Sequence, residues 1–352
     1  MESILRIQLI KALVLSLSVL LIASCKTESG KSTKETVDKP SIFDKLSKDG
    51  LLEFELHADI DSLILAKEEE KYFPATISFK DKNDGLVTEE INIGTRGKTR
   101  KNICEMPPLR LKFPKPYLEK NELAKYKTLK LVIPCKGEPG YEDLVRKELL
   151  CYQMYQALTD QSFRAQLANI EIKQKGGSKI SSKNLSFLIE HKEEMARRLG
   201  GTLIDKSAKA IKTIDIKSYN LLVLYQYMIG NTDWNLSRRH NIKLVQIEGL
   251  SAPVPVPYDF DYSGLVNAKY AVPHPNLPIK NIRDRLFQWK GKNPEILKAP
   301  IAQLLDKKEV LLNLMENCPL ENQEEKTSMI DFVKSFFEII ESEDGLAKLT
   351  KK

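Results

Sequence analysis

Three short stretches decide the expected fold: MIGNTDW at 228–234, HN at 240–241 and PYDFD at 257–261. An apolar run at 223–229 ends in a polar loop that carries Asp233, which is typical of a helix followed by a turn. A short strand is predicted directly after HN, and a second strand at 254–258 leads into Asp259. An acid, an amide and a second acid therefore stand at the ends of successive elements.

These three polar residues are of the types that phosphoryl transfer requires. One carboxylate, Asp233, would orient or deprotonate an attacking hydroxyl, while Asn241 and Asp259 would hold a divalent metal against nucleotide phosphates. Each residue alone is also an ordinary turn or capping residue. Their order along the chain, and the element that precedes each of them, favour a catalytic site.

The same segment resembles the spore-coat protein H (CotH) kinase family, in which a G-N-x-D-W loop is followed by Asn and a strand ends in Y-D-F-D with S-G behind it. Residues 258–264 read YDFDYSG here. HipA-like kinases are similar more distantly. The resemblance covers residues 50–300 and implies an α+β, two-lobed, atypical protein-kinase-like fold with a β-rich N-lobe and a helical C-lobe.

This resemblance also implies the roles of the site residues. Asp233 is expected to be the catalytic base, Asn241 and Asp259 metal ligands, and Asp261 an assisting ligand. Mg²⁺ or Mn²⁺ and ATP are the implied cofactors. Because the gap between the loop acid and its amide is longer here than in the family, Asn235 is an alternative to Asn241.

A helix predicted at 141–158 places Glu148 in the middle of its apolar stripe. A carboxylate there needs a partner, because burying an unpaired charge is costly. Kinases supply a strand lysine, which pairs with this glutamate and positions the phosphates. The strand at 109–113 offers Lys112, with Arg110 as the second choice, and a purely structural salt bridge is the alternative interpretation.

Two further segments are candidates for nucleotide contacts. TRGKTR at 95–100 resembles the family's R-G-N-[ST] segment, with Lys98 in place of Asn, so that Arg96 and the backbone at Gly97 would meet phosphates. A basic hairpin turn is the alternative. Adenine is expected to bond to backbone near Ile189 and Glu190, where a strand leads into the C-lobe.

The N-terminal sequence predicts the cellular location. A basic flank precedes an apolar run at 12–23, and LIASC at 21–25 resembles a bacterial lipobox. Residues 1–24 are therefore predicted to be a lipoprotein signal peptide, and 25–45 a lipidated Cys25 with a flexible, polar tether. The expected location is the bacterial cell envelope, outside the cytoplasm and lipid-anchored to a membrane, with the outer membrane favoured.

The remaining chain is divided into a β-rich N-lobe at 46–190 and a helical C-lobe at 191–352. Strands are expected at 51–57, 74–79, 89–95, 109–113, 128–133, 164–172 and 185–190, and helices at 191–199, 214–229 and in several segments from 282 onward. Cys104 and Cys135 flank adjacent predicted strands and could pair, whereas Cys151 is expected in the core. The formal charge of +7 is spread along the chain, and nothing resembles a nucleic-acid-binding module.

Two functions follow from this pattern. The first is a lipid-anchored kinase that transfers the γ-phosphoryl group of ATP to a hydroxyl of an unknown protein or other surface substrate. The second is a non-catalytic envelope lipoprotein that keeps the kinase fold as a binding or structural module. Nucleotide and membrane are the expected partners, and nucleic acid is not.

Overall fold

The computed structural model describes residues 39–81, 83–176, 181–205 and 213–350. The predicted signal peptide, Cys25 and most of the predicted tether lie outside the described residues. Every element below belongs to one compact unit, Pro40–Lys352. Among the described helices, none combines the length and the apolar character that a membrane span requires.

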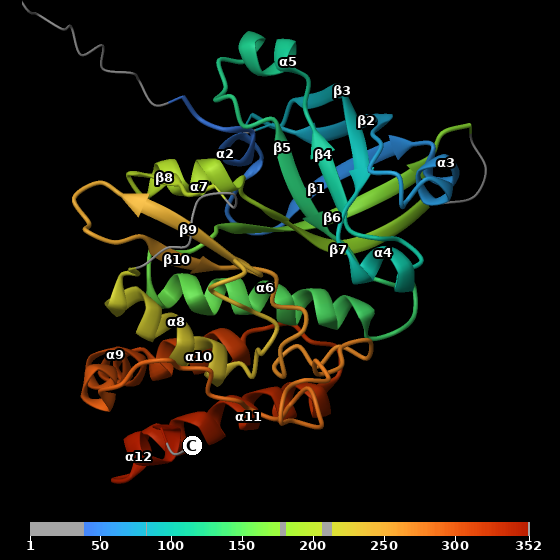
Figure 1. Ribbon diagram of the computed structural model, residues 1–352. Helices are drawn as coiled ribbons and strands as arrows, with labels where there is room; N and C mark the ends of the chain where they lie inside the picture. Colours follow the sequence, from blue (N-terminus) through green and yellow to red (C-terminus); the bar gives the residue numbers. More distant parts are fainter. Residues whose placement is uncertain (1–38, 82, 177–180, 206–212, 351–352) are drawn as a thin grey trace, which may run out of the picture. The chain divides into compact units, whose positions relative to one another are not determined.

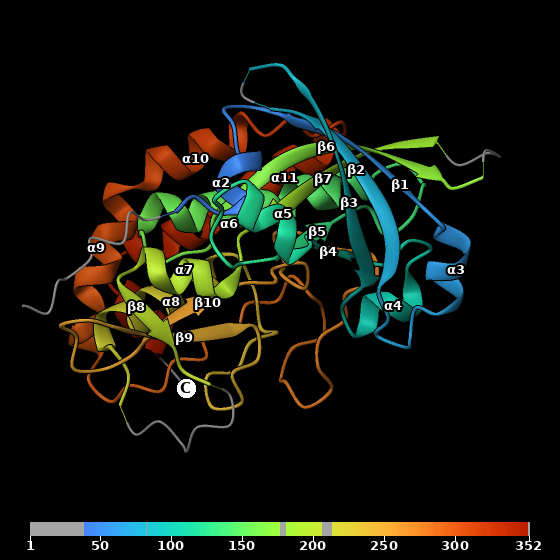
Figure 2. The ribbon, with the colours of Figure 1, turned by 90° about the horizontal axis from the view of Figure 1, so that it is seen from above.

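Within the described residues, seven strands close into a barrel in the order β1-β2-β3-β4-β5-β7-β6. They are β1 (Leu52–Ala58), β2 (Phe73–Lys80), β3 (Leu86–Thr95), β4 (Leu109–Lys112), β5 (Thr128–Val132), β6 (Ala165–Gln174) and β7 (Ser181–Ile189). Neighbouring strands are antiparallel except β1 and β6, whose parallel pairing closes the barrel. Figures 1 and 2 show the strands curving around a common interior.

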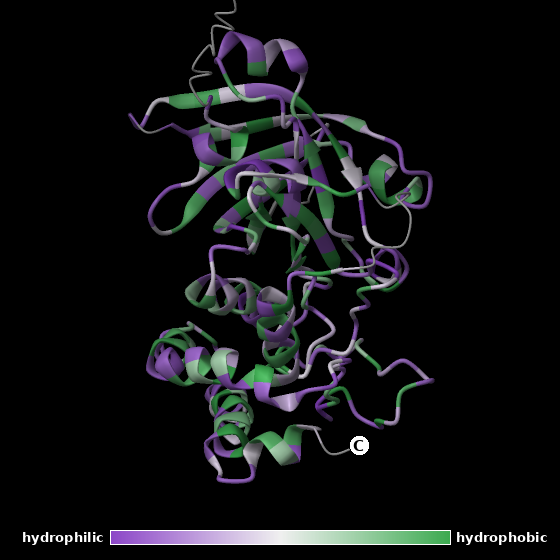
Figure 3. Ribbon diagram, turned by 60° about the vertical axis from the view of Figure 1, so that its left-hand side comes forward, coloured by the Kyte–Doolittle hydropathy of each residue, from purple (hydrophilic) through white to green (hydrophobic). Residues whose placement is uncertain are grey.

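Alternation along the strands fills the barrel interior. Leu56, Ile77, Ile93 and Leu111 are fully buried in one apolar cluster, and their neighbours in sequence point outward. Figure 3 shows the resulting alternation of hydrophobic and hydrophilic residues along the strands. The expected strands are confirmed, with ends that differ by a few residues.

Helix α6 (Tyr141–Leu158) lies between the barrel and the C-terminal helices (Figure 1), in contact with β6, β7 and α10. It joins the core that extends into the C-terminal part of the chain. Three short helices lie in the connections between barrel strands: α3 (Ile60–Leu65), α4 (Thr99–Ile103) and α5 (Lys115–Lys120). A disulfide joins Cys104 to Cys135, the pairing that the sequence left possible, and Cys151 is buried in the core, as expected.

The C-terminal part contains a small sheet as well as helices. Its sheet has the order β10-β9-β8, from β8 (Gly201–Leu203), β9 (Ile242–Ile247) and β10 (Val254–Pro257). Its helices are α7 (Lys192–Arg198), α8 (Ile216–Met228), η1 (Pro294–Leu297), α9 (Lys298–Asp306), α10 (Lys308–Glu316), α11 (Gln323–Glu341) and α12 (Gly345–Thr350). The mixed α and β composition is confirmed, whereas the two-lobed kinase arrangement stays a prediction.

The expectation of helix directly from residue 282 is wrong. Residues 282–293 form no helix. Side chains hold this segment against α8 instead, because Arg285 donates to the carbonyl of Met228 and the Trp289 indole donates to Asn220 at 2.9 Å.

The predicted tether also ends too late. Helix α2 (Ile42–Leu46) begins with a capping box at Ser41, and Ile42 and Leu46 are buried in the barrel core. The Ser41 hydroxyl donates to Glu194 at 2.6 Å. Residues 41–46 therefore belong to the folded unit. Burial of their apolar side chains in the barrel core is favoured in free energy over their exposure to water in a tether.

Candidate functional site

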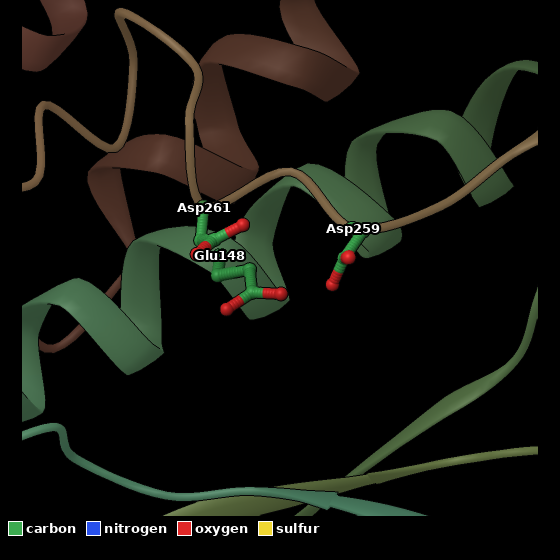
Figure 4. A group of neighbouring side chains, drawn as sticks. All are labelled: Glu148, Asp259 and Asp261. Carbon is green, nitrogen blue, oxygen red and sulfur yellow. The ribbon is translucent and has the colours of Figure 1, made fainter. Parts of the chain in front are cut away.

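Three carboxylates from two distant segments meet beside α6 (Figure 4). Glu148 comes from the middle of α6, and Asp259 and Asp261 come from the loop after β10. One oxygen of each lies within 4.8 Å of the others. Glu148 and Asp261 are buried, and Asp259 is half-buried. Such a cluster is electrostatically costly unless cations balance it.

The pKa shifts report this cost. Burial and the neighbouring Asp261 raise the pKa of Glu148, and Arg100 acts in the opposite direction. Burial and the neighbouring Asp259 likewise raise the pKa of Asp261, again against Arg100. Oε1 of Glu148 is buried without a hydrogen-bond partner among the described residues. A set of hard carboxylate oxygens with one unsatisfied acceptor fits Mg²⁺ or Mn²⁺.

The partner of Glu148 is Arg100, not Lys112 or Arg110. Arg100 Nη1 lies 3.5 Å from Glu148 Oε2, and its Nη2 donates to the carbonyl of Ile133 at 2.7 Å. Gly97, with φ +90°, turns the chain after β3 into α4 and so directs Arg100 inward.

Lys112 and Arg110 contact Tyr72 and not Glu148, although they share the outer face of the barrel with Lys130. Leu109 and Leu111 point into the barrel, so Arg110 and Lys112 project from its outer face. There Lys112 Nζ lies 4.6 Å from the ring centre of Tyr72, and Arg110 donates to the Tyr72 hydroxyl at 3.3 Å.

Asp233 stands in a small polar network at the end of α8. Asn241 donates from Nδ2 to both the carbonyl and the carboxylate of Asp233, at 2.8 and 2.9 Å. His240 Nε2 lies 2.9 Å from the other carboxylate oxygen. Burial raises the pKa of Asp233, and His240 acts in the opposite direction. The alternative residue Asn235 instead accepts the backbone N–H of Arg238 at 2.8 Å within its turn.

An unusual backbone conformation sets the direction of two predicted metal ligands. Asn241 and Asp259 have φ of +52° and +66°, a region that residues with a Cβ seldom adopt. The buried Tyr152 hydroxyl accepts the Asp259 N–H at 2.9 Å, and Phe260 packs edge-on against the Tyr152 ring. These contacts with α6 hold the Asp259 backbone in its unusual conformation.

Two loops that are distant in sequence are joined at this point. Asn231 forms a β-bridge with Ser263, and the Gly264 N–H donates to the Gly230 carbonyl at 3.0 Å. Gly230 has φ +62°, and a Cβ there would lie 2.8 Å from the Phe332 ring. The loop of Asp233 is thereby placed next to the loop of the two other aspartates.

Cations from the barrel and from the small sheet line the same region. Arg96 is buried, and its Nε has no hydrogen-bond partner among the described residues. Lys130 of β5 and Lys243 of β9 lie over the ring of Tyr258, at 4.4 and 4.8 Å from its centre. Desolvation and the nearby Arg96 lower the pKa of Lys130 to about 7, although Asp259 acts in the opposite direction.

The two positions predicted to bind adenine already make hydrogen bonds within the protein. Ile189 pairs with both Lys130 and Ala165 in the barrel. The Glu190 N–H donates to the Arg164 carbonyl at 3.1 Å, and its buried carboxylate accepts from Arg164 and Arg198 at 2.8 and 2.7 Å. The N–H of Glu190, one of the backbone groups near which adenine was expected to bind, is therefore already engaged.

Four residues of the site were not predicted: Arg100, Lys130, Tyr152 and His240. Arg100 ends the basic segment that also holds Arg96, and Lys130 follows the strand alternation of β5. Tyr152 stands one helical turn after Glu148. Local patterns place these residues on faces of elements, but they do not identify which faces meet.

No protein-family model and no curated protein matches this sequence. Among solved structures, the chain is similar to the proinflammatory kinase CtkA of Helicobacter pylori, with 10% sequence identity and a TM-score of 0.40. The similarity covers 70% of this chain and 96% of that chain. A likeness at this TM-score carries no argument, so membership of the spore-coat protein H kinase family stays a prediction.

Proposed function

We propose that this protein is a kinase-like phosphotransferase of the spore-coat protein H type. It moves the γ-phosphoryl group of ATP onto a hydroxyl of a protein or other surface molecule. It does so outside the cytoplasm, anchored through lipid on Cys25. The resemblance of residues 228–264 and the lipobox support this proposal from the sequence.

One structural observation carries the proposal. The loop that bears Asp233 and the loop that bears Asp259 and Asp261 are bonded to each other, and the charge of Asp259 acts on the Asp233 carboxylate. A half-exposed acid for the acceptor hydroxyl thus adjoins buried acids suited to a metal. Phosphoryl transfer requires that arrangement.

Asp233 would act on the acceptor. Its carboxylate takes the proton of the attacking hydroxyl, whose oxygen forms a bond to the γ-phosphorus of ATP while the bond to the β,γ-bridging oxygen breaks and ADP leaves. Asn241 holds one carboxylate oxygen of Asp233 and His240 contacts the other, so that the base keeps one orientation.

The acid cluster would hold the divalent cation. Glu148, Asp259 and Asp261 supply its carboxylate ligands, and Asn241 stays the predicted amide ligand. When bound, Mg²⁺ or Mn²⁺ supplies positive charge that neutralises phosphate oxygens. The unsatisfied Oε1 of Glu148 is the feature of this structure that supports the assignment.

Calorimetry of the purified full-length protein tests this function. ATP should bind more tightly in the presence of Mg²⁺ or Mn²⁺ than in EDTA, and Asp259→Ala should abolish this metal-dependent binding. Asp344→Ala is the matched control, because Asp344 is exposed and pairs with Lys348 one helical turn away. An ATP affinity that is equal with metal and in EDTA, or a metal-dependent affinity that Asp259→Ala leaves unchanged, would contradict the proposal. Binding without ³²P transfer to any acceptor extract would favour the non-catalytic module.

A further inference from the structure

Two lysines from different sheets share one aromatic ring. Lys130 belongs to the barrel strand β5, and Lys243 belongs to β9 of the small sheet. Both ammonium groups lie over Tyr258, and Lys243 also donates to the Tyr258 hydroxyl at 3.1 Å. Tyr258 directly precedes Asp259. The ring therefore holds two cations beside the acid cluster.

More positive charge surrounds this pair. Arg110 lies directly opposite Lys130 in the β4–β5 ladder, a cross-strand arrangement that is destabilising for like charges. Arg96 and Lys243 also repel the charged form of Lys130. An arrangement of this kind is stabilised by an anion between the cations.

A second, independent observation points to the same ligand class. Arg96 is about nine-tenths buried, and its Nε is without a hydrogen-bond partner in the described part of the chain. A buried guanidinium donor that is left unsatisfied costs free energy, and phosphate oxygens are the acceptors that guanidinium groups match best. The charges of Arg96 and of Asp259 both act on Lys130.

We propose that Arg96, Lys130 and Lys243, arranged around Tyr258, form a phosphate clamp that bridges the barrel and the small sheet. This inference rests on the proposed function, which it deepens by assigning the polyphosphate contacts to these cations instead of Lys112. The phosphate would come from the nucleotide or from a phosphorylated acceptor.

Calorimetry with sodium tripolyphosphate in EDTA measures the clamp alone. Lys130→Met and Lys243→Met should each weaken tripolyphosphate binding by about 10- to 100-fold, as expected for the loss of a charged hydrogen bond. Lys45→Met is the matched control, because Lys45 also lies over a tyrosine ring, Tyr117, at 5.3 Å and donates to an uncharged side chain. Its affinity should equal that of the wild type.

Two further titrations identify the source of the phosphate. Weaker MgATP binding by both lysine variants assigns the clamp to the nucleotide, whereas weaker binding of O-phosphoserine with unchanged MgATP affinity assigns it to a phosphorylated acceptor. Circular dichroism melting establishes that each variant is folded. If Lys130→Met does not fold, Lys243→Met decides the result by itself.

The outcomes separate this inference from the proposed function. Failure of the wild type to bind tripolyphosphate, or wild-type affinity in both lysine variants, would overturn the clamp. If MgATP still binds in those cases and requires Asp259, the proposed function stands. If tripolyphosphate binds and both variants weaken it while MgATP does not bind, the clamp stands and the proposed function fails.

Discussion

Replacing Arg100 by Met tests which cation neutralises the acid cluster. Arg100 is buried, pairs with Glu148 and donates to the carbonyl of Ile133. Methionine keeps an unbranched apolar stem but removes the charge. Glu148 would then remain buried beside Asp261 without its cation. Lys112 is not the observed partner of Glu148, because its ammonium group lies over the ring of Tyr72.

The structure sets the size of the effect. Removing one partner of a buried ion pair costs about 3–5 kcal/mol, since the other charge is left uncompensated. For a unit of this size that loss lowers the melting temperature by on the order of 10 °C. Lys112→Met should cost less than about 1 kcal/mol, because a cation–π contact at a partly exposed site contributes little. The double variant Arg100→Met/Glu148→Gln should recover most of the loss, because neither charge remains.

Urea unfolding of the wild type, Arg100→Met, Lys112→Met, Glu148→Gln and the double variant, followed by circular dichroism in EDTA, measures these differences. The double-mutant comparison isolates the coupling between Arg100 and Glu148, which are in direct contact. A cost below about 1 kcal/mol for Arg100→Met would refute the assignment. So would a loss for Lys112→Met that equals the loss for Arg100→Met, because the partner expected from the sequence would then be correct.

Four other changes have definite expected outcomes. Asp233→Asn should keep MgATP binding but reduce ³²P transfer by about 10²–10⁴-fold, as positioned proton transfer contributes that much, and equal transfer would remove this acid from the mechanism. Tyr152→Phe should weaken Mn²⁺ binding by calorimetry without unfolding the protein, since it deletes only the acceptor of the Asp259 N–H; unchanged affinity would show that this bond does not position the ligand. Replacing the disulfide cysteine Cys104 by Ser should lower the free energy of unfolding by about 2–4 kcal/mol in urea, with dithiothreitol producing the same loss in the wild type alone. Cys25→Ser should abolish metabolic labelling with a fatty acid, and equal labelling of both proteins would exclude the lipid anchor at this residue.

Much of the barrel could be predicted from the sequence, because strand periodicity is a local property. Alternation of apolar side chains at 74–79 and 128–133 identifies β2 and β5 and also their inward faces. The closure of the barrel could not be predicted in the same way. It depends on the parallel pairing of β1 with β6, two strands that are far apart in the sequence.

The candidate site likewise has parts that local sequence patterns predict and parts that depend on contacts between distant segments. Asp233, Asn241 and Asp259 were predicted because element order places polar residues at the ends of helices and strands, and because their motifs resemble those of the spore-coat protein H kinase family. Glu148 was found because a carboxylate in an apolar helical stripe is conspicuous. Its partner was not found, since strand alternation shows which face a lysine occupies but not what that face meets.

The sequence by itself determined the types of the elements, the positions of the acids at their ends, the possible pairing of Cys104 with Cys135 and the lipobox pattern. Only the tertiary structure decided which charges meet. It brought Arg100 to Glu148 through the turn at Gly97 and placed Lys112 outside the barrel. The physical reason is that helix and strand patterns extend over only a few residues. Which cation lies beside a buried charge depends instead on how distant segments of the chain pack together.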